Sequence, residues 1–368
     1  MKDFNLTDID IITSAGHFAI EGNIINIEEC HNGHINRTYF LTYDTGKRYV
    51  MQMVNTDIFK KPDEVMENIV GVTEHIRKGY EAKGIDPSRR AINVIWTKDG
   101  KWGYFDHRSI YWRMYDFVED SDCYMQVESA EMFTKVGIAF GQFQRQLADF
   151  DASRLHESIP NFHNTEWRFS NLEKAIAENK SGRAHLIPDD IKFALDRKEI
   201  TSYINKSIAD GSLKLRVTHN DTKLNNIMMD KETGEGICVI DLDTVMPGSV
   251  LADFGDSIRF GASSAAEDET DLDKVYCRLD MFEAFAKGFI EGLEGSLTES
   301  EIRALPMGAL ILTYETGIRF LSDYLDGDVY FRTAYPNHNL DRARNQFKLV
   351  ADMESKMDEM RRIVEKYI

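Results

Sequence analysis

The sequence lacks the long apolar segments that mark secreted and membrane-spanning chains. It contains no run of 18 apolar residues, so we expect no transmembrane helix. Its first residues, Met1-Lys2-Asp3-Phe4-Asn5, have no apolar core of the kind that signal peptides carry. These two absences predict a cytoplasmic protein that does not have a membrane as its partner.

Cysteine is also scarce. The chain has four cysteines, and they form no CxxC pair and have no close histidine partner: Cys30, Cys123, Cys238 and Cys277. This spacing excludes the usual zinc sites and gives no reason to expect disulfides. We expect reduced thiols buried in the core.

Basic charge is in deficit. The chain has 44 Lys and Arg against 62 Asp and Glu, a net charge of −18. Nucleic acids and anionic membranes are bound by clustered Lys and Arg, so neither is expected as a partner. The balance would suit a cationic ligand, although net charge mainly determines solubility. With 42% hydrophobic residues, the 368-residue chain is typical of globular proteins with two domains.

The pattern of apolar residues predicts a mixed α+β fold without repeats or low-complexity linkers. Alternation predicts strands at residues 35–43, 49–54, 92–96, 102–105 and 110–117, with a helix that begins at Pro62. Later segments favour a long helix over 133–150, short strands at 214–218, 226–229 and 237–242, and helices from residue 275. We therefore expect a strand-rich N-terminal lobe at residues 1–115, a helix-rich C-terminal lobe at residues 116–368, and a hinge near residues 115–119.

One stretch carries the residue types that phosphoryl transfer from ATP needs. His219 and Asp221 are followed by Asn226, and an apolar strand runs into Asp241 twenty residues after Asp221. Asp221 could act as the base for an acceptor hydroxyl, while Asn226 and Asp241 offer the hard oxygen ligands that Mg²⁺ prefers. The competing interpretation, that these residues only cap turns, does not require a second Asp at a strand end.

The same residues resemble a known family. The run from His219 to Asn226, with Ile240-Asp241, is similar to the aminoglycoside phosphotransferase and choline kinase branch of the protein-kinase-like fold. Further segments resemble more closely the N-acetylhexosamine 1-kinases of that branch; they include Gly33-His34-Ile35-Asn36, Met246-Pro247-Gly248-Ser249 and Arg319-Phe320-Leu321. The resemblance covers residues 16–350. It implies ATP and an N-acetylhexosamine sugar (GlcNAc or GalNAc) as substrates, with transfer to the anomeric hydroxyl.

The resemblance also implies which residues bind each substrate. The nucleotide would contact Ile27, Gly33, Gln52 and Phe117, and the sugar would contact His34, Asp221, Phe260, Arg319 and Tyr330. Without the resemblance, Ile27 and Phe260 would be interpreted as core residues and Arg319 as a salt-bridge residue.

The sequence departs from many kinases in one strand. No Lys that could contact the ATP phosphates is found in the strand Tyr49-Val50-Met51-Gln52-Met53-Val54, and Gln52 is the nearest polar candidate.

Two other functions stay open. A kinase with another acceptor, such as an aminoglycoside, choline or another sugar, would fit the acidic composition. A catalytically inactive binding module would require a broken loop, yet Asp221, Asn226 and Asp241 are all present.

Overall fold

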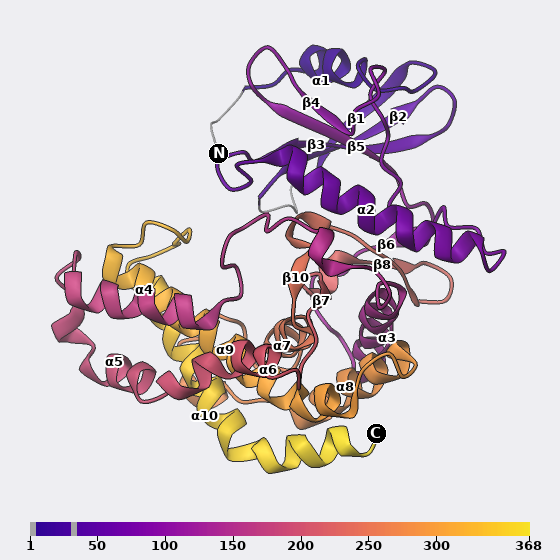
Figure 1. Ribbon diagram of the computed structural model, residues 1–368. Coiled ribbons are helices and arrows are strands. Elements are labelled where there is room, and N and C mark those ends of the chain that lie inside the picture. Colours follow the sequence, from indigo (N-terminus) through magenta and orange to yellow (C-terminus); the bar gives the residue numbers. More distant parts are fainter. Residues whose placement is uncertain (1–4, 31–34) are drawn as a thin grey trace.

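The computed structural model describes residues 5–30 and 35–368. The N-terminal part is built on a five-stranded antiparallel sheet with the order β1-β2-β3-β5-β4. Its strands are β1 (Ile24–Cys30), β2 (Arg37–Tyr43), β3 (Arg48–Val54), β4 (Gly103–Phe105) and β5 (Tyr111–Asp116). Two helices, α1 (Asp8–Ala15) and α2 (Pro62–Glu81), lie on opposite faces of this sheet, as Figure 1 shows.

Strict alternation decides which side chains meet each helix. Leu41, Met51 and Trp112 point to the face under α1 and are fully buried there. On the other face Val54 and Tyr115 pack with α2, whose buried positions Val65, Ile69 and Ile76 follow the helical period. The hairpin between β2 and β3 turns at Gly46, which has a φ of +81° that favours glycine. The face of the sheet that packs with α2 is also the face that belongs to one cluster with residues of the C-terminal part, such as Val217 and Leu242.

Two small sheets begin the C-terminal part. One has the order β6-β8-β9 and the other pairs β10 with β7. Their bounds are β6 (Ser121–Asp122), β7 (Arg216–Thr218), β8 (Ile227–Asp230), β9 (Gly236–Val239) and β10 (Met246–Gly248). The α2 side chain of Asn68 donates to the carbonyl of Val245 at 3.0 Å, which ties the N-terminal part to the segment after β9.

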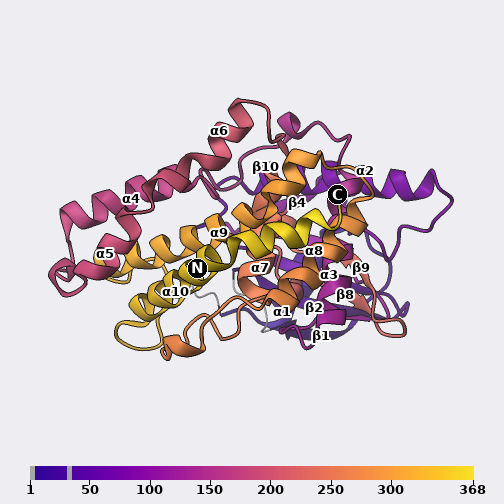
Figure 2. The same cartoon turned by 90° about the horizontal axis from the view of Figure 1, so that it is seen from below.

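Eight helices form most of the C-terminal part among the described residues (Figure 2). They are α3 (Ala130–Gln146), α4 (Thr165–Glu178), α5 (Pro188–Leu195), α6 (Tyr203–Ala209), α7 (Val250–Gly261), α8 (Leu279–Leu293), α9 (Glu299–Asp326) and α10 (His338–Glu365). Glycines allow α3 and α8 to touch backbone to backbone, because a Cβ at Gly141 or Gly288 would collide with carbonyl oxygens of the other helix. This close contact fixes α3, whose Phe140 and Phe143 rings pack edge-on against the ring of His219.

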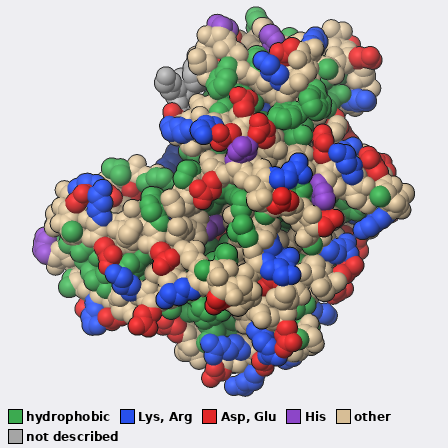
Figure 3. All heavy atoms as spheres, in the orientation of Figure 1, with side chains coloured by type: hydrophobic (Ala, Val, Ile, Leu, Met, Phe, Trp, Pro, Cys, Tyr) green, Lys and Arg blue, Asp and Glu red, His purple; other side chains and the backbone are tan. Residues whose placement is uncertain are grey.

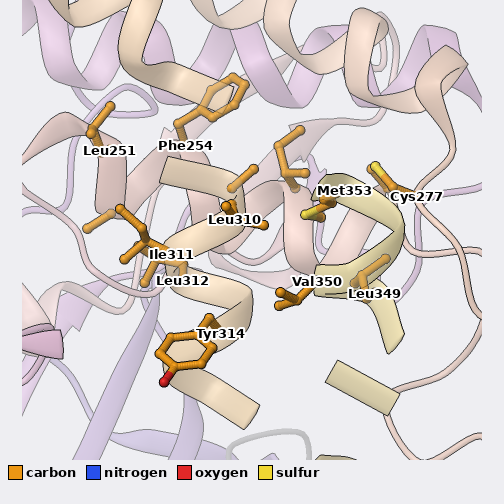
Figure 4. Packing of buried hydrophobic residues seen from close by; sticks show 14 of the residues in the cluster. Leu251, Phe254, Cys277, Leu310, Ile311, Leu312, Tyr314, Leu349, Val350 and Met353 are labelled. Carbon is orange, nitrogen blue, oxygen red and sulfur yellow. The ribbon is translucent and has the colours of Figure 1, made fainter. Parts of the chain in front are cut away.

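The largest core joins α7, α9 and α10 with α3, α4 and α8. Figure 4 shows part of this core, with Leu251 and Phe254 of α7, Leu310, Ile311 and Leu312 of α9, and Leu349, Val350 and Met353 of α10. Tyr314 of α9 is also buried, and its hydroxyl donates to the carbonyl of Ala194 at 2.7 Å. Because α7 and α9 are held so rigidly, the polar residues that they carry have fixed positions.

The predicted α+β composition is confirmed, with some local differences. The segment 92–96 forms only an isolated bridge between Val94 and Tyr115 and no strand. Helix α1 was not expected, although Thr7 and Asp10 form a capping box at its start. No helix in the described ranges is both long and apolar enough to cross a bilayer. Figure 3 shows acidic and basic side chains interspersed over the face in view.

Candidate functional site

The loop after β7 brings the predicted catalytic and metal-binding residues together. Asn226 donates through Nδ2 to the Asp221 carbonyl at 2.8 Å and to Asp221 Oδ2 at 3.1 Å. The backbone N–H of Ile240 donates to the Asn226 carbonyl at 2.9 Å, which places Asp241 beside the loop. Residues 20 positions apart in the sequence therefore meet at one end of the β8–β9 hairpin.

Buried hydrogen bonds hold this loop in shape. The Asp253 carboxylate on α7 accepts from the backbone N–H groups of His219 and Asn220, at 3.0 and 2.7 Å. The His219 ring contacts the carbonyl of Ile240 through Nε2 at 2.9 Å. Asn220 and Asp241 have φ angles of 65° and 57°, in the left-handed region that Asn and Asp tolerate best among non-glycine residues. The backbone at Asn220 and Asp241 is thus held by hydrogen bonds with the side chains of Asp253 and His219.

The carboxyl group of Asp241 is a weaker acid than an ordinary aspartate. Desolvation, followed by the negative charges of Asp243 and Asp221, raises the pKa of Asp241 to about 7. Asp241 is an exposed residue, so its two negatively charged neighbours act on it together with desolvation. A cation beside Asp241 would remove this repulsion, and the site is therefore electrostatically suited to bind one.

A cavity of about 330 Å³, here called the central cavity, adjoins these residues. Asn226 and Asp241 line it from the C-terminal part, while Gln52 and Phe117 line it from the N-terminal part. The Phe117 ring packs edge-on against Phe40 at 5.5 Å, with the Arg48 guanidinium 3.9 Å from its centroid. The cavity therefore collects four of the residues that the sequence assigned to ATP and metal binding.

Among the predicted nucleotide contacts that the structure describes, Ile27 does not line the central cavity. Ile27 pairs with Leu41 and packs into the cluster under α1, on the opposite face of the sheet. The register of β1 thus turns the Ile27 side chain away from the central cavity, and its contact with a nucleotide stays a prediction. Gly33 and His34 lie outside the described residues.

Phe260, at the end of α7, lines an adjoining cavity of about 490 Å³. Its ring is 47% exposed, and the Lys223 ammonium lies 5.7 Å from its centroid. Lys223 also forms an ion pair with Asp221 Oδ1 at 2.8 Å. Met125 and Asn225 border both this Phe260 cavity and the central cavity. Phe260 is thus an exposed wall residue near the loop that carries Asp221 and not a core residue, while its contact with a sugar stays a prediction.

Arg319 and Tyr330 line a third cavity of about 370 Å³ beside α4, separate from the other two. The Arg319 guanidinium lies 5.6 Å from the ring of Phe331. One turn earlier on α9, Glu315 contacts His163, whose other ring nitrogen contacts the Asn220 carbonyl at 3.0 Å. Side-chain contacts from Glu315 through His163 to Asn220 thus connect the helix that carries Arg319 with the loop before Asp221.

The His163–Glu315 pair is buried and ionic. Burial lowers the pKa of His163, but the adjacent Glu315 carboxylate raises it above its ordinary value overall. Desolvation likewise opposes ionisation of Glu315, yet the His163 charge depresses the pKa of Glu315 below its ordinary value. Both shifts favour a charged pair, which fixes the loop before Asp221 against α9.

Sequence reasoning missed the principal cation of the central cavity. Arg113 of β5 is 1% exposed and donates to Gln52 Oε1 through Nε and Nη2, at 3.0 and 2.8 Å. It also forms a two-pronged ion pair with Asp243, with one contact of 2.9 Å between Nη2 and Oδ2. Asp243 raises the pKa of Arg113 above its ordinary value, against the effect of desolvation. The sequence offered one signal for this residue, because Arg113 is a single charge within the aromatic and apolar strand Tyr111–Tyr115.

Asn36 completes this buried network. Its side chain donates to Asp243 Oδ2 at 2.6 Å and accepts from the backbone N–H of Asn55 at 2.9 Å. The strand β3 has Gln52 where many kinases have a lysine, and the positive charge beside it lies on the neighbouring strand β5. The pairing of Gln52 with Arg113 across β3 and β5 brings the two side chains together.

Cavity size alone does not identify the site. A groove of about 510 Å³ near the end of α8 is larger than the central cavity, but it is lined by residues such as Leu293, Ile302 and Tyr367. It contains none of the loop residues described above. The case for the central cavity rests on its carboxylates, its amides and the buried arginine.

Comparison with known proteins agrees with this geometry. The APH family, described as the phosphotransferase enzyme family, matches residues 26–284, more than half of the chain. The structure is similar to that of an aminoglycoside phosphotransferase from Alicyclobacillus acidocaldarius, with a TM-score of 0.61 and 12% identity over 99% of this chain and 98% of that one.

Two other kinases share the fold. An amicoumacin kinase in complex with AMP-PNP, Ca²⁺ and Ami has a TM-score of 0.61 and 13% identity, covering 95% of this chain and 94% of that one. A choline kinase from Cryptosporidium parvum has a TM-score of 0.56 and 14% identity, covering 97% and 98%. The protein-kinase-like fold is therefore confirmed, and the chain belongs to the APH phosphotransferase enzyme family.

Proposed function

We propose that this protein is an ATP-dependent kinase that phosphorylates the anomeric hydroxyl of an N-acetylhexosamine, GlcNAc or GalNAc. The observation that carries the proposal is the meeting of Asp221, Asn226 and Asp241 beside the central cavity. This constellation supplies a base and a pair of oxygen ligands at the same place, which is the arrangement that phosphoryl transfer requires.

In this proposal ATP occupies the central cavity between an N-terminal lobe at residues 1–115 and a C-terminal lobe at residues 116–368. Phe117, in the proposed hinge at residues 115–119, offers an aromatic wall to the base. Gln52 and Arg113 lie across the cavity from Asp241, and we assign the neutralisation of phosphate charge to Arg113. Its guanidinium has five N–H groups, and the contacts to Gln52 and Asp243 use four of them.

A magnesium ion fits the donor set at Asn226 and Asp241. Asn226 uses its amide nitrogen for Asp221, so its amide oxygen is the atom available to a cation. Asp241 contributes a carboxylate whose neighbours already oppose its ionisation. When bound, the metal would neutralise charge that develops on the phosphates.

Asp221 would act on the acceptor. Lys223 contacts one of its carboxylate oxygens and Asn226 the other, so the carboxylate is held in one orientation. The acceptor oxygen attacks the γ-phosphorus of ATP while the bond from that phosphorus to ADP breaks. The hydroxyl proton passes to the Asp221 carboxylate, and orientation of the hydroxyl supplies much of the benefit.

The acceptor class rests on the resemblance of the site segments. We assign His34, Phe260, Arg319 and Tyr330 to the sugar, although the Arg319 cavity lies apart from the Phe260 cavity. Lys223 and Arg259 beside Phe260 disfavour a cationic acceptor such as choline or an aminoglycoside. The net charge of −18 and the aminoglycoside and choline kinases of similar fold favour that second candidate.

A panel of acceptors tests the proposal directly. ATP consumption is measured with GlcNAc, GalNAc, glucose, kanamycin and choline, and the position of the new phosphate is read by ³¹P NMR. Turnover with an N-acetylhexosamine and a phosphate on C1 would support the proposal. Turnover with kanamycin or choline alone would replace the sugar by a cationic acceptor while keeping the kinase. No turnover of ATP with any acceptor would contradict the kinase proposal itself.

A further inference from the structure

Two of the four cysteines are not core residues, contrary to the expectation from sequence. Cys238 and Cys277 are buried, with exposures of 2% and 1%. Cys123 is exposed and Cys30 is partly exposed, and both line the central cavity. The chain therefore separates its thiols into a buried pair and a pair that faces the proposed nucleotide site.

The two cavity thiols come from different sheets. Cys30 is the last residue of β1 and pairs with Thr38, whose hydroxyl accepts from Gln52 at 3.0 Å. Cys123 directly follows β6, which pairs with β8, and Asn226 immediately precedes β8. A group attached to either sulfur would consequently extend into the space between Gln52 and Asn226.

The thiols are also near enough to influence one another. Desolvation and then the neighbouring Cys30 raise the pKa of Cys123 above its ordinary value. Since the thiolate is the reactive form, we expect Cys123 to react more slowly than a free thiol in solution. Burial raises the pKa values of Cys238 and Cys277 to about 12, so these thiols should be slower still.

We propose that Cys30 and Cys123 form a thiol-modification site inside the central cavity, where a small disulfide bonded to Cys123 prevents nucleotide binding. This inference rests on the proposed function, because it places ATP in the same cavity. The Cys123 thiolate attacks one sulfur of a disulfide RSSR, the S–S bond breaks, and RS⁻ leaves and takes up the proton that Cys123 released.

The probe is 5,5′-dithiobis(2-nitrobenzoate), an aromatic disulfide that releases one coloured thiolate for each thiol modified. The full-length protein is treated with and without MgATP, and each cysteine is assigned by peptide mass spectrometry. Labelling of Cys123 and Cys30 should precede labelling of Cys238 and Cys277, which serve as controls in the same chain. MgATP should slow the first two reactions and leave the slow pair unchanged.

Nucleotide binding is the second readout, measured by calorimetry with AMP-PNP and independent of any acceptor. Modification of Cys123 should weaken binding by about tenfold or more, and a reducing agent should restore it. The double variants Cys30→Ser/Cys123→Ser and Cys30→Ala/Cys123→Ala, each compared with its own untreated sample, should lose most of this sensitivity. Two independent substitutions are used so that one poorly folded variant does not decide the result.

Each outcome separates the two proposals. If the unmodified protein binds AMP-PNP and complete modification of Cys123 leaves the affinity unchanged, the thiol site is refuted and the kinase proposal stands. If the unmodified protein binds no nucleotide, the block proposed here is refuted together with the nucleotide site. Labelling of Cys238 or Cys277 before Cys123 would also contradict the proposal, because the exposed pair would then not be the reactive one.

Discussion

Removal of the buried Arg113–Asp243 ion pair should lower the stability of the protein strongly. Both side chains are nearly inaccessible, with exposures of 2% and 4%, and Arg113 also donates twice to Gln52. Replacement of Arg113 by Met would leave a buried carboxylate with only Asn36 as a side-chain donor. Loss of one partner from a buried ion pair typically costs about 3–5 kcal/mol, so we expect Arg113→Met to lower the free energy of unfolding by about that amount.

Urea denaturation followed by tryptophan fluorescence measures this loss. Asp243→Asn and the double variant complete a thermodynamic cycle, in which we expect a coupling energy of about 2–3 kcal/mol between the two sites. The matched control is Arg278→Met, because the Arg278–Asp280 pair has a similar 2.7 Å contact but exposures of 44% and 62%. It should cost less than about 1 kcal/mol. An Arg113→Met variant as stable as this control would refute the role given to the buried pair.

Three further predictions concern the site. Asp241→Ala should abolish metal-dependent turnover more completely than Asn226→Ala, because a carboxylate contributes a full charge; excess Mg²⁺ should rescue only Asn226→Ala, and equal losses without rescue would make Asn226 structural. The folded-state pKa of Asp241, about 7, exceeds its ordinary 3.8, so Asp241 costs the metal-free protein stability as pH rises between these values. Asp241→Asn should therefore raise the melting temperature at pH 8 more than at pH 4, and an equal change at both would contradict the shift. Arg319→Ala should raise KM for the sugar by about 10–150-fold and leave KM for ATP nearly unchanged, with a melting curve as control; a stable variant with unchanged sugar KM would remove Arg319 from the site.

Much of the fold could be predicted because local patterns dominate it. The alternation in residues 35–43 and 49–54 identified β2 and β3, and Pro62 marked the first residue of α2. The segment 92–96 alternates in the same way but finds no partner for a full ladder, so it forms only a bridge. Sequence alternation reports the propensity for a strand, whereas the strand itself depends on a neighbour.

The candidate site was predictable where its residues are close in sequence. Asp221 and Asn226 share one loop, and a hairpin brings Asp241 back to them. Arg113 could not be assigned, because its role depends on the pairing of β3 with β5 and on an ion pair across 130 positions. The face of the sheet that Ile27 occupies and the location of Cys123 also depend on register and on long-range packing, which a single sequence does not specify.

The most direct test of the central claim is the turnover number of Asp221→Asn with the best acceptor from the panel. This change keeps the size of the side chain, so circular dichroism and the melting temperature should show an intact fold. The account predicts that kcat falls by about 10²–10⁴-fold, the usual contribution of a general base. A folded Asp221→Asn variant that retains more than about half of the wild-type rate would show that Asp221 is not the base and would contradict the proposed mechanism.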